Sequence, residues 1–208
     1  MLIRHRSSVP RVDPTAYVAP TATLAGAVEV GPRARVMFGA VLDGEGSRIE
    51  IAECAIVCEQ AVLRATAAGD EDHPVLIGDH VFVGPHATLL GCTVGAAAYL
   101  ATGATVLQGA VLGSGAVVAV GALVHAGTRL PDELFVPPGT IAIGDPPRIF
   151  APSQQAELAQ AIKEVGFAAR AFGVTTAWED RATRYREVTE VRSREFAAHA
   201  DDEVLDER

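Results

Sequence analysis

Residues 100–124 read LATGATVLQGAVLGSGAVVAVGALV, and an aliphatic side chain recurs at every sixth position of this stretch. A small residue often precedes the aliphatic by two positions, as at Ala104, Ala116 and Ala122. A period of six fits neither an α-helix, with 3.6 residues per turn, nor a lone strand with alternating faces. It is the hexapeptide signature of a parallel β-helix, in which each repeat supplies one short strand and one corner. The aliphatics in this stretch are Leu100, Val106, Leu112, Val118 and Val124.

The same period extends toward the N-terminus. We expect each aliphatic to point into the coil, where stacked repeats form ladders of similar side chains. Such a core needs few aromatic residues, and aromatics make up only 5% of the 208 residues. The sequence therefore predicts an all-β coil over most of the chain. The earlier aliphatics are Val12, Val18, Leu24, Val30, Val36, Leu42, Ile51, Val57, Leu63, Ile77, Val83, Leu89 and Val94.

The phase of the repeat breaks at three places. Residues 43–50 insert a few residues, and residues 65–74 insert a longer polar, acidic loop. Between Leu89 and Thr93 one repeat is a residue short. Insertions in a coil of this kind project outward and often line a binding site.

The composition changes after residue 150, which divides the chain into a β-helix over 1–150 and a helical extension over 151–208. Ser153 is a suitable N-cap for a first helix that ends at Gly173. We expect a second helix over roughly 178–200 and frayed residues 201–208. The predicted apolar face of the second helix consists of Trp178, Ala182, Tyr185 and Val188.

Charge and hydropathy exclude several classes of partner. The formal net charge is −9 and no basic run is present, so a nucleic acid or an anionic membrane would be repelled. Residues 81–128 carry no Asp, Glu, Lys or Arg, but regularly spaced glycines argue against a membrane-spanning helix. Three cysteines and no leader-like start predict reduced thiols in the cytoplasm.

Several elements together resemble the γ-class carbonic anhydrases and their relatives. These are the hexapeptides, the long loop after residue 66, the GCTVG of residues 91–95 and the PPGTIAIGDPPR of residues 137–148. The resemblance implies a left-handed parallel β-helix and a homotrimer. It also implies a zinc or iron ion at each subunit interface, held by two histidines of one subunit and one of its neighbour.

All three ligand positions that this resemblance implies have lost histidine. The first follows Val62-Leu63 and is Arg64; the others are Pro85 and Leu90. None of these side chains offers a lone pair to a metal ion. We therefore expect no metal and no metal-bound hydroxide, and hence no hydration of CO2.

The supporting positions differ as well. Asp43-Gly44-Glu45 stands where the family has Arg-Gly-Asp, and Cys58-Glu59 stands where it has Gln-Asp. Arg64 can either pair with one of the nearby carboxylates or hold an anionic ligand in place of the metal. The candidate ligand-binding residues are thus Arg64, Glu59, Cys58, Glu45 and Asp43.

His86 lies one residue after the second ligand position. It is either a general base or a histidine at a coil corner, and it is the candidate catalytic residue. Three functions remain open. The first is acyl transfer with an acyl-CoA co-substrate and His86 or His125 as base, on fold analogy alone. The others are binding of a small anionic metabolite and a structural role in a homo- or heterotrimer. No other cofactor is expected.

Overall fold

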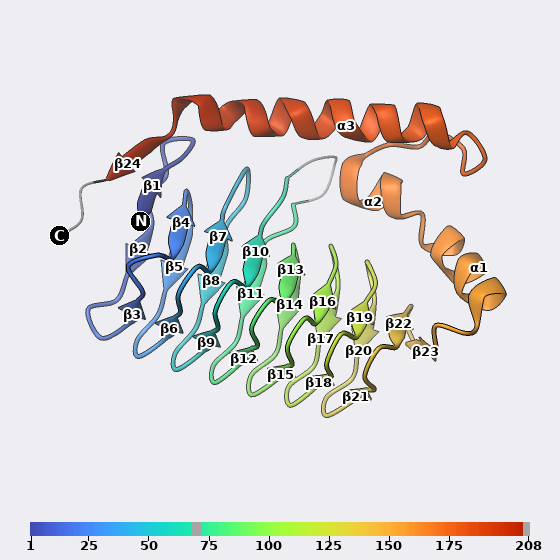
Figure 1. Ribbon diagram of the computed structural model, residues 1–208, viewed down its shortest axis with the longest axis horizontal. Coiled ribbons are helices and arrows are strands. Elements are labelled where there is room, and N and C mark those ends of the chain that lie inside the picture. The colour runs from blue at the N-terminus through green and yellow to red at the C-terminus, as the bar shows by residue number, and fades with distance from the viewer. Residues whose placement is uncertain (68–71, 206–208) are drawn as a thin grey trace.

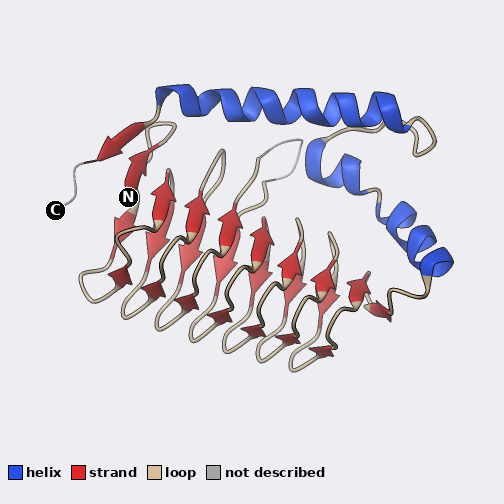
Figure 2. Cartoon of the chain, viewed as in Figure 1, coloured by secondary structure: helices blue, strands red, loops and turns tan. Residues whose placement is uncertain are grey.

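The computed structural model describes residues 1–67 and 72–205. Over these residues the chain winds into a coil whose strands fall into three sheets, and helices cross one side of the coil (Figure 1). Figure 2 shows that the strands and the helices occupy separate parts of the molecule. The hexapeptide period therefore predicts the fold class correctly: successive short strands in sequence belong to different sheets, and each pairs with its equivalent one turn later.

The main sheet has ten strands and the two other sheets have seven each. All pairings within the coil are parallel, apart from the two antiparallel strands β23 and β24 at its ends. The main sheet contains β1 (Leu2–Arg4), β4 (Thr23–Ala25), β7 (Val41–Asp43), β10 (Val62–Arg64), β13 (Thr88–Leu90), β16 (Thr105–Val106), β19 (Leu123–Val124), β22 (Ile141–Ile143), β23 (Arg148–Phe150) and β24 (Glu203–Leu205). The second sheet contains β2 (Arg11–Val12), β5 (Val28–Val30), β8 (Ile49–Ile51), β11 (Val75–Ile77), β14 (Thr93–Val94), β17 (Val111–Leu112) and β20 (Arg129–Leu130). The third contains β3 (Tyr17–Val18), β6 (Arg35–Val36), β9 (Ile56–Val57), β12 (Phe82–Val83), β15 (Tyr99–Leu100), β18 (Val117–Val118) and β21 (Phe135–Val136).

The core consists of the period-six aliphatics stacked in ladders. In the main sheet Leu42, Leu63 and Leu89 lie in register on consecutive turns, and all three are fully buried. The small residues two positions earlier, such as Ala61 and Ala87, are buried too. Repeated burial of similar side chains closes the coil without large aromatics, as the sequence predicts.

The short repeat between Leu89 and Thr93 has a local cause. Gly91 adopts a φ of 47°, and a Cβ at this position would lie 2.5 Å from the Cβ of His73. Only glycine fits where the chain turns this tightly against the base of the acidic insertion. His73 pairs with Thr66 across that base, and residues 68–71 of the insertion lie outside the described residues.

Three helices follow the coil: α1 (Gln155–Val165), α2 (Phe167–Phe172) and α3 (Arg181–Ala197). Gly166 separates the first two and Gly173 ends the second, both with positive φ. The predicted N-cap at Ser153 is wrong: the cap position is Gln154, which makes no side-chain capping bond. Among the described residues, no helix is both long and apolar enough to span a membrane.

Two other predictions about the extension need correction. Residues 203–205 are not frayed but form β24, which pairs antiparallel with β1 and covers the edge of the main sheet. On α3, Ala182 and Tyr185 are exposed while Arg184 is buried. The predicted face is thus inward only in part: Trp178, Tyr185 and Val188 line a cavity against α1 and α2, whereas Ala182 does not.

Candidate functional site

The last positions of four neighbouring strands of the main sheet form one row on the outer surface. The strand register places Ala25 beside Asp43, Asp43 beside Arg64, and Arg64 beside Leu90. Two of the three positions at which the resemblance implies metal ligands, Arg64 and Leu90, are thus direct neighbours. Their side-chain chemistry still provides no metal donor.

Arg64 forms an ion pair inside its own chain. Its Nε lies 3.4 Å from Oδ2 of Asp43, whose side chain is 8% exposed while that of Arg64 is 32% exposed. The Nε–H of Arg64 has no hydrogen-bond acceptor among the described residues. The carboxylate that pairs with Arg64 is therefore that of Asp43. About a third of the Arg64 side chain remains exposed to solvent.

The second carboxylate of the 43–50 insertion binds α3 instead. Arg192 of α3 contacts Glu45 through two N···O pairs, at 2.9 and 3.2 Å. The Glu45 side chain is 1% exposed, and its backbone has a positive φ of 45°. The Glu45 backbone N–H donates to Oδ1 of Asp43 at 3.0 Å, so the two carboxylates are held by one turn.

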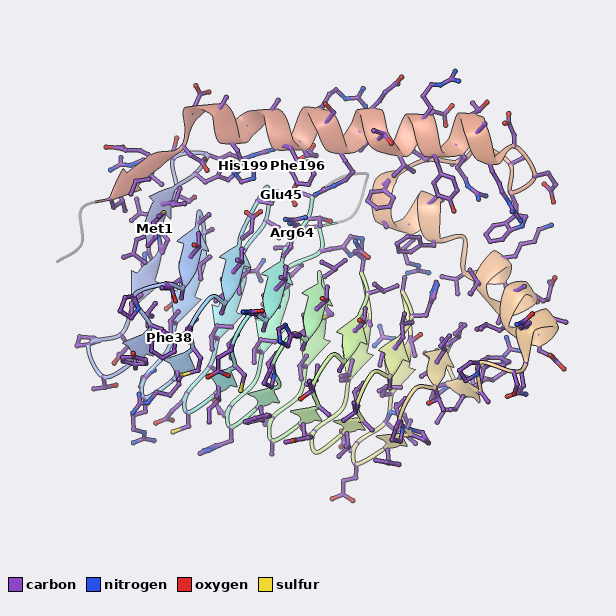
Figure 3. All side chains as sticks on the ribbon, viewed as in Figure 1. Met1, Phe38, Glu45, Arg64, Phe196 and His199 are labelled. Carbon is purple, nitrogen blue, oxygen red and sulfur yellow. The ribbon has the colours of Figure 1, made fainter. Side chains whose placement is uncertain are left out.

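Phe196 of α3 lies against both guanidinium groups (Figure 3). Its ring centroid is 5.1 Å from Cζ of Arg64 and 4.3 Å from Cζ of Arg192. Cation–π contacts of this kind attract the helix to the coil. Arg192, Phe196 and His199 recur at helical spacing and therefore share one face.

A histidine cluster continues the network toward the N-terminus. His5 and His199 stack with ring centroids 4.2 Å apart. Their Nδ1 atoms lie 2.6 and 2.9 Å from the two carboxylate oxygens of Asp202. Nε2 of His199 lies 3.6 Å from Oδ2 of Asp43. Burial alone would raise the pKa of Asp202, but the hydrogen bonds from His199 and His5 lower it below its ordinary value.

His5, His199 and Asp202 are the one group of potential metal donors close enough to share an ion among the described residues. In this structure their donor atoms are hydrogen-bonded to one another. We refer to Asp43, Glu45 and Arg64 of the coil, with Arg192, Phe196, His199 and Asp202 of the C-terminal segment and His5, as the strap cluster.

The sequence and the fold are similar to those of known proteins. No family model matches the sequence. The chain is 32% identical over 166 residues to gamma carbonic anhydrase 1 of Arabidopsis thaliana mitochondria, covering 76% of this chain and 58% of that protein. It is 37% identical over 112 residues to gamma carbonic anhydrase 3 of the same plant, covering 50% and 43%.

The chain is a homologue of the γ carbonic anhydrases. It spans about half the length of the curated relatives it matches. A hexapeptide transferase family protein from Anaplasma phagocytophilum has a similar solved structure, with a TM-score of 0.59, 22% identity and coverage of 93% and 97% of the two chains. The similarity confirms the predicted fold, a left-handed parallel β-helix with C-terminal helices.

The remaining predicted site residues of this γ-carbonic-anhydrase homologue do not join the strap cluster within one chain. His86 is exposed at a coil corner, with a φ of 57°. Glu59 is also exposed, and its backbone carbonyl accepts a hydrogen bond from the His86 N–H at 3.0 Å. No ion pair links Glu59 to Arg64 among the residues described. Pro85 is half-buried and directly precedes His86. It follows β12 of the third sheet, whereas Arg64 and Leu90 end strands of the main sheet.

The cysteines are poor candidates for soft metal ligands. Burial raises the pKa of Cys58, and burial raises the pKa of Cys92 to about 12. Both thiols therefore stay protonated at neutral pH, whereas metal binding needs a thiolate. Cys54 is half-buried and its Sγ accepts from Nε of Arg33 at 3.2 Å.

Sequence reasoning missed the C-terminal half of the strap cluster. The sequence predicts only that Arg192 and His199 lie in a helix over roughly 178–200 and that Asp202 lies in a frayed end. The i, i+4, i+7 spacing of Arg192, Phe196 and His199 is the one signal that marks a shared face. Nothing in the sequence says that this face meets Asp43 and Glu45.

Proposed function

We propose that this chain is a trimer-forming structural subunit that does not hydrate CO2. The observation that carries the proposal is the neighbouring pair Arg64 and Leu90 at two of the three implied ligand positions. Arg64 keeps its proton and Leu90 has no donor atom, so these residues do not fit a zinc or iron ion. Without the ion no hydroxide is generated at neutral pH.

The outer surface of the coil supports self-association. Along the third sheet an outward row of side chains lies in register, and most of its members are apolar. Tyr99 and Phe135 are 46% and 52% exposed in the single chain. A continuous apolar row of this kind on a monomer would be costly to leave in water. The row is Tyr17, Arg35, Ile56, Phe82, Tyr99, Val117 and Phe135.

Charge balance favours a structural role over anion binding at the strap cluster. The cluster has two guanidinium groups and three carboxylates: Arg64 pairs with Asp43, Arg192 pairs with Glu45, and Asp202 bonds to His5 and His199. The guanidinium groups are already neutralised within the chain, so an added anion would meet a negative surplus unless the histidines are charged. In this proposal the network replaces the metal ion as the element that fixes this edge of the subunit.

A second candidate, binding of a small anionic metabolite or acyl transfer from acyl-CoA, rests on the exposed part of Arg64. Its Nε lies 3.4 Å from Asp43, and 32% of the side chain is exposed. In a trimer of the family type, the His86 corner of one subunit would face the Arg64 edge of the next. His86 would then be the base, with Glu59 and Cys58 beside it. Three unpaired thiols fit a reducing cytoplasm for either candidate.

Native mass spectrometry with metal analysis tests the first candidate. We expect a trimer with well under one transition metal per chain, and CO2 hydration at background even with added zinc or cobalt. A stoichiometric metal that survives replacement of His199 would contradict the proposal. The triple change Arg64→His, Pro85→His and Leu90→His should restore metal binding if the three positions meet across subunits.

Arg64 variants separate the two candidates. Arg64→Ala should weaken the trimer, measured by dilution in analytical ultracentrifugation, and Arg64→Lys should rescue it only in part because lysine lacks the planar fork. The second candidate would be favoured by two results together. The Arg64→Ala variant would remain a trimer, and an acyl-CoA would raise the thermal stability of the unsubstituted chain but not of this variant.

A further inference from the structure

The three helices of the extension enclose a cavity of about 280 Å³ that lies apart from the strap cluster. Figure 1 shows α1 and α2 lying beneath one end of α3, away from the β1 edge of the coil. Most of the side chains around the cavity are apolar, which is the usual character of a small-molecule site. They include Ile162, Phe167, Phe172, Val174, Trp178 and Val188.

One charged group of α3 also lines the cavity and is nearly buried. Arg184 is 4% exposed, and its Nε is covered and has no hydrogen-bond partner. Among residues 1–67 and 72–205, no carboxylate forms an ion pair with its guanidinium. Arginine is seldom buried this far without an anionic partner, because removing its charge from water costs several kcal/mol.

Two aromatic rings flank this guanidinium, and the exposed carboxylate of Glu179 lies near enough for the two charges to interact without forming an ion pair. The guanidinium Cζ lies 4.7 Å from the ring centroid of Trp178 and 5.0 Å from that of Tyr185. These contacts orient the cation but leave its Nε–H without a hydrogen-bond acceptor. Arg192, on the same helix, shows the contrast: it has both a ring and a carboxylate, Glu45.

The acidic side chains nearest this region are engaged elsewhere. Glu179 binds Nζ of Lys163 at 2.7 Å, and both side chains are largely exposed. Glu187 accepts a hydrogen bond from the Thr176 hydroxyl. The cavity therefore combines a largely apolar wall, whose edge includes Lys163 paired with Glu179, with one buried cation that has no ion-pair partner among the described residues.

We propose that this cavity binds a monocarboxylate with a short apolar tail, its carboxylate on Arg184 and its tail among Phe167, Phe172 and Val188. A guanidinium and a carboxylate match in a two-pronged geometry, and a single negative charge neutralises the single cation. An uncharged molecule would fill the apolar space but leave Arg184 unpaired. This site is independent of the proposed structural function, because it uses none of the strap-cluster residues.

Trp178 is the only tryptophan of the chain, so its fluorescence reports directly on the cavity. Titration of the purified full chain with sodium octanoate should give a saturable fluorescence change. Octan-1-ol, which has the same tail without the charge, should bind at least tenfold more weakly. In parallel, octanoate should shift the Nε–H resonance of Arg184 in a nitrogen-15 NMR spectrum of the unsubstituted chain, which needs no variant.

Arg184→Met and Arg181→Met form a matched pair of variants. Arg181 lies 5.9 Å from the same Trp178 ring but does not line the cavity. Arg184→Met should lose the preference for octanoate over octan-1-ol, while Arg181→Met should keep it. The proposal is overturned if octanoate gives no saturable signal at millimolar concentration, if the two probes bind equally to the unsubstituted chain, or if the Arg184 resonance does not move.

Discussion

The coil from Leu2 to Phe150 and the segment from Arg181 to Leu205 that crosses it are stabilised by different kinds of interaction. In the coil each turn buries similar aliphatic and small residues, and every strand pairs with its equivalents one turn away. The crossing segment buries few apolar side chains and is held by the strap cluster and by the β1–β24 pairing. The comparison shows that one chain can combine a repetitive core with an attachment made of a few long-range polar contacts.

This difference has an energetic consequence. Removing one apolar side chain from the coil leaves a cavity that its stacked neighbours cannot fill, since they are themselves fixed by the repeat. Removing one charge from the strap cluster leaves a buried opposite charge without its partner. Changes outside both regions should cost little.

The largest effect is expected in the ladder of the main sheet. Leu89 is fully buried between Leu63 and Val106, so Leu89→Ala should lower the free energy of unfolding by about 4 kcal/mol in urea denaturation. Leu76→Ala is the control, because Leu76 points outward between buried Val75 and Ile77 and should cost about 1 kcal/mol. Equal losses in the two variants would mean that the inward ladder does not dominate stability.

The next effect concerns the attachment of α3. Glu45→Gln keeps the shape but leaves Arg192 with a neutral partner, and we expect a loss of about 3 kcal/mol. Amide hydrogen exchange should increase in α3 and β24 while the ladder of the coil stays protected. Glu50→Gln breaks the exposed pair with Arg48 and should cost less than about 1 kcal/mol. If exchange rises equally in coil and helix, the two regions unfold as one unit.

A pH-dependent effect is expected at the boundary between coil and helices. Burial lowers the pKa of His125 below 6.5, and its ring meets Phe167 edge-on at 5.7 Å. As the pH falls below about 6.5, His125 is therefore protonated in the unfolded chain, whereas in the folded chain it is protonated only at lower pH. Stability should fall as pH drops below about 6.5, by at most about 1.4 kcal/mol per pH unit from this group.

His125→Gln should remove that part of the pH dependence, measured by urea denaturation between pH 7.5 and about 5. The same change at exposed His80 should leave the profile unaltered. A His125→Gln profile identical to that of the unsubstituted chain would show that this ring is protonated as easily in the fold as in water.

The smallest effect is expected at the coil corner. His86 is exposed, so His86→Ala should change the free energy of unfolding by less than about 1 kcal/mol. His86→Asn is the matched control, since asparagine tolerates the positive φ better than alanine. A loss of several kcal/mol in both variants would indicate that the His86 side chain is covered by a neighbouring subunit.

The coil could be predicted from the order of residues alone, because the cause of that fold is local and repeated. Leu63 and Leu89 are buried for the same reason as every other aliphatic in the period, so the pattern predicts each position independently of the rest. The loss of metal donors at Arg64 and Leu90 could also be predicted, because donor chemistry belongs to the residue type. The turn at Gly91 and the stop at Gly173 are equally local.

How the extension joins the coil depends on contacts that exist only in the folded molecule. Arg192 meets Glu45 across 147 positions of sequence, and residues 203–205 become a strand only because β1 offers an unpaired edge. Arg184 is buried for a similar reason, since residues of α1 and α2 close the cavity that it lines together with Trp178 and Tyr185. Such contacts carry no period and depend on the meeting of distant surfaces, which the order of residues along the chain does not record.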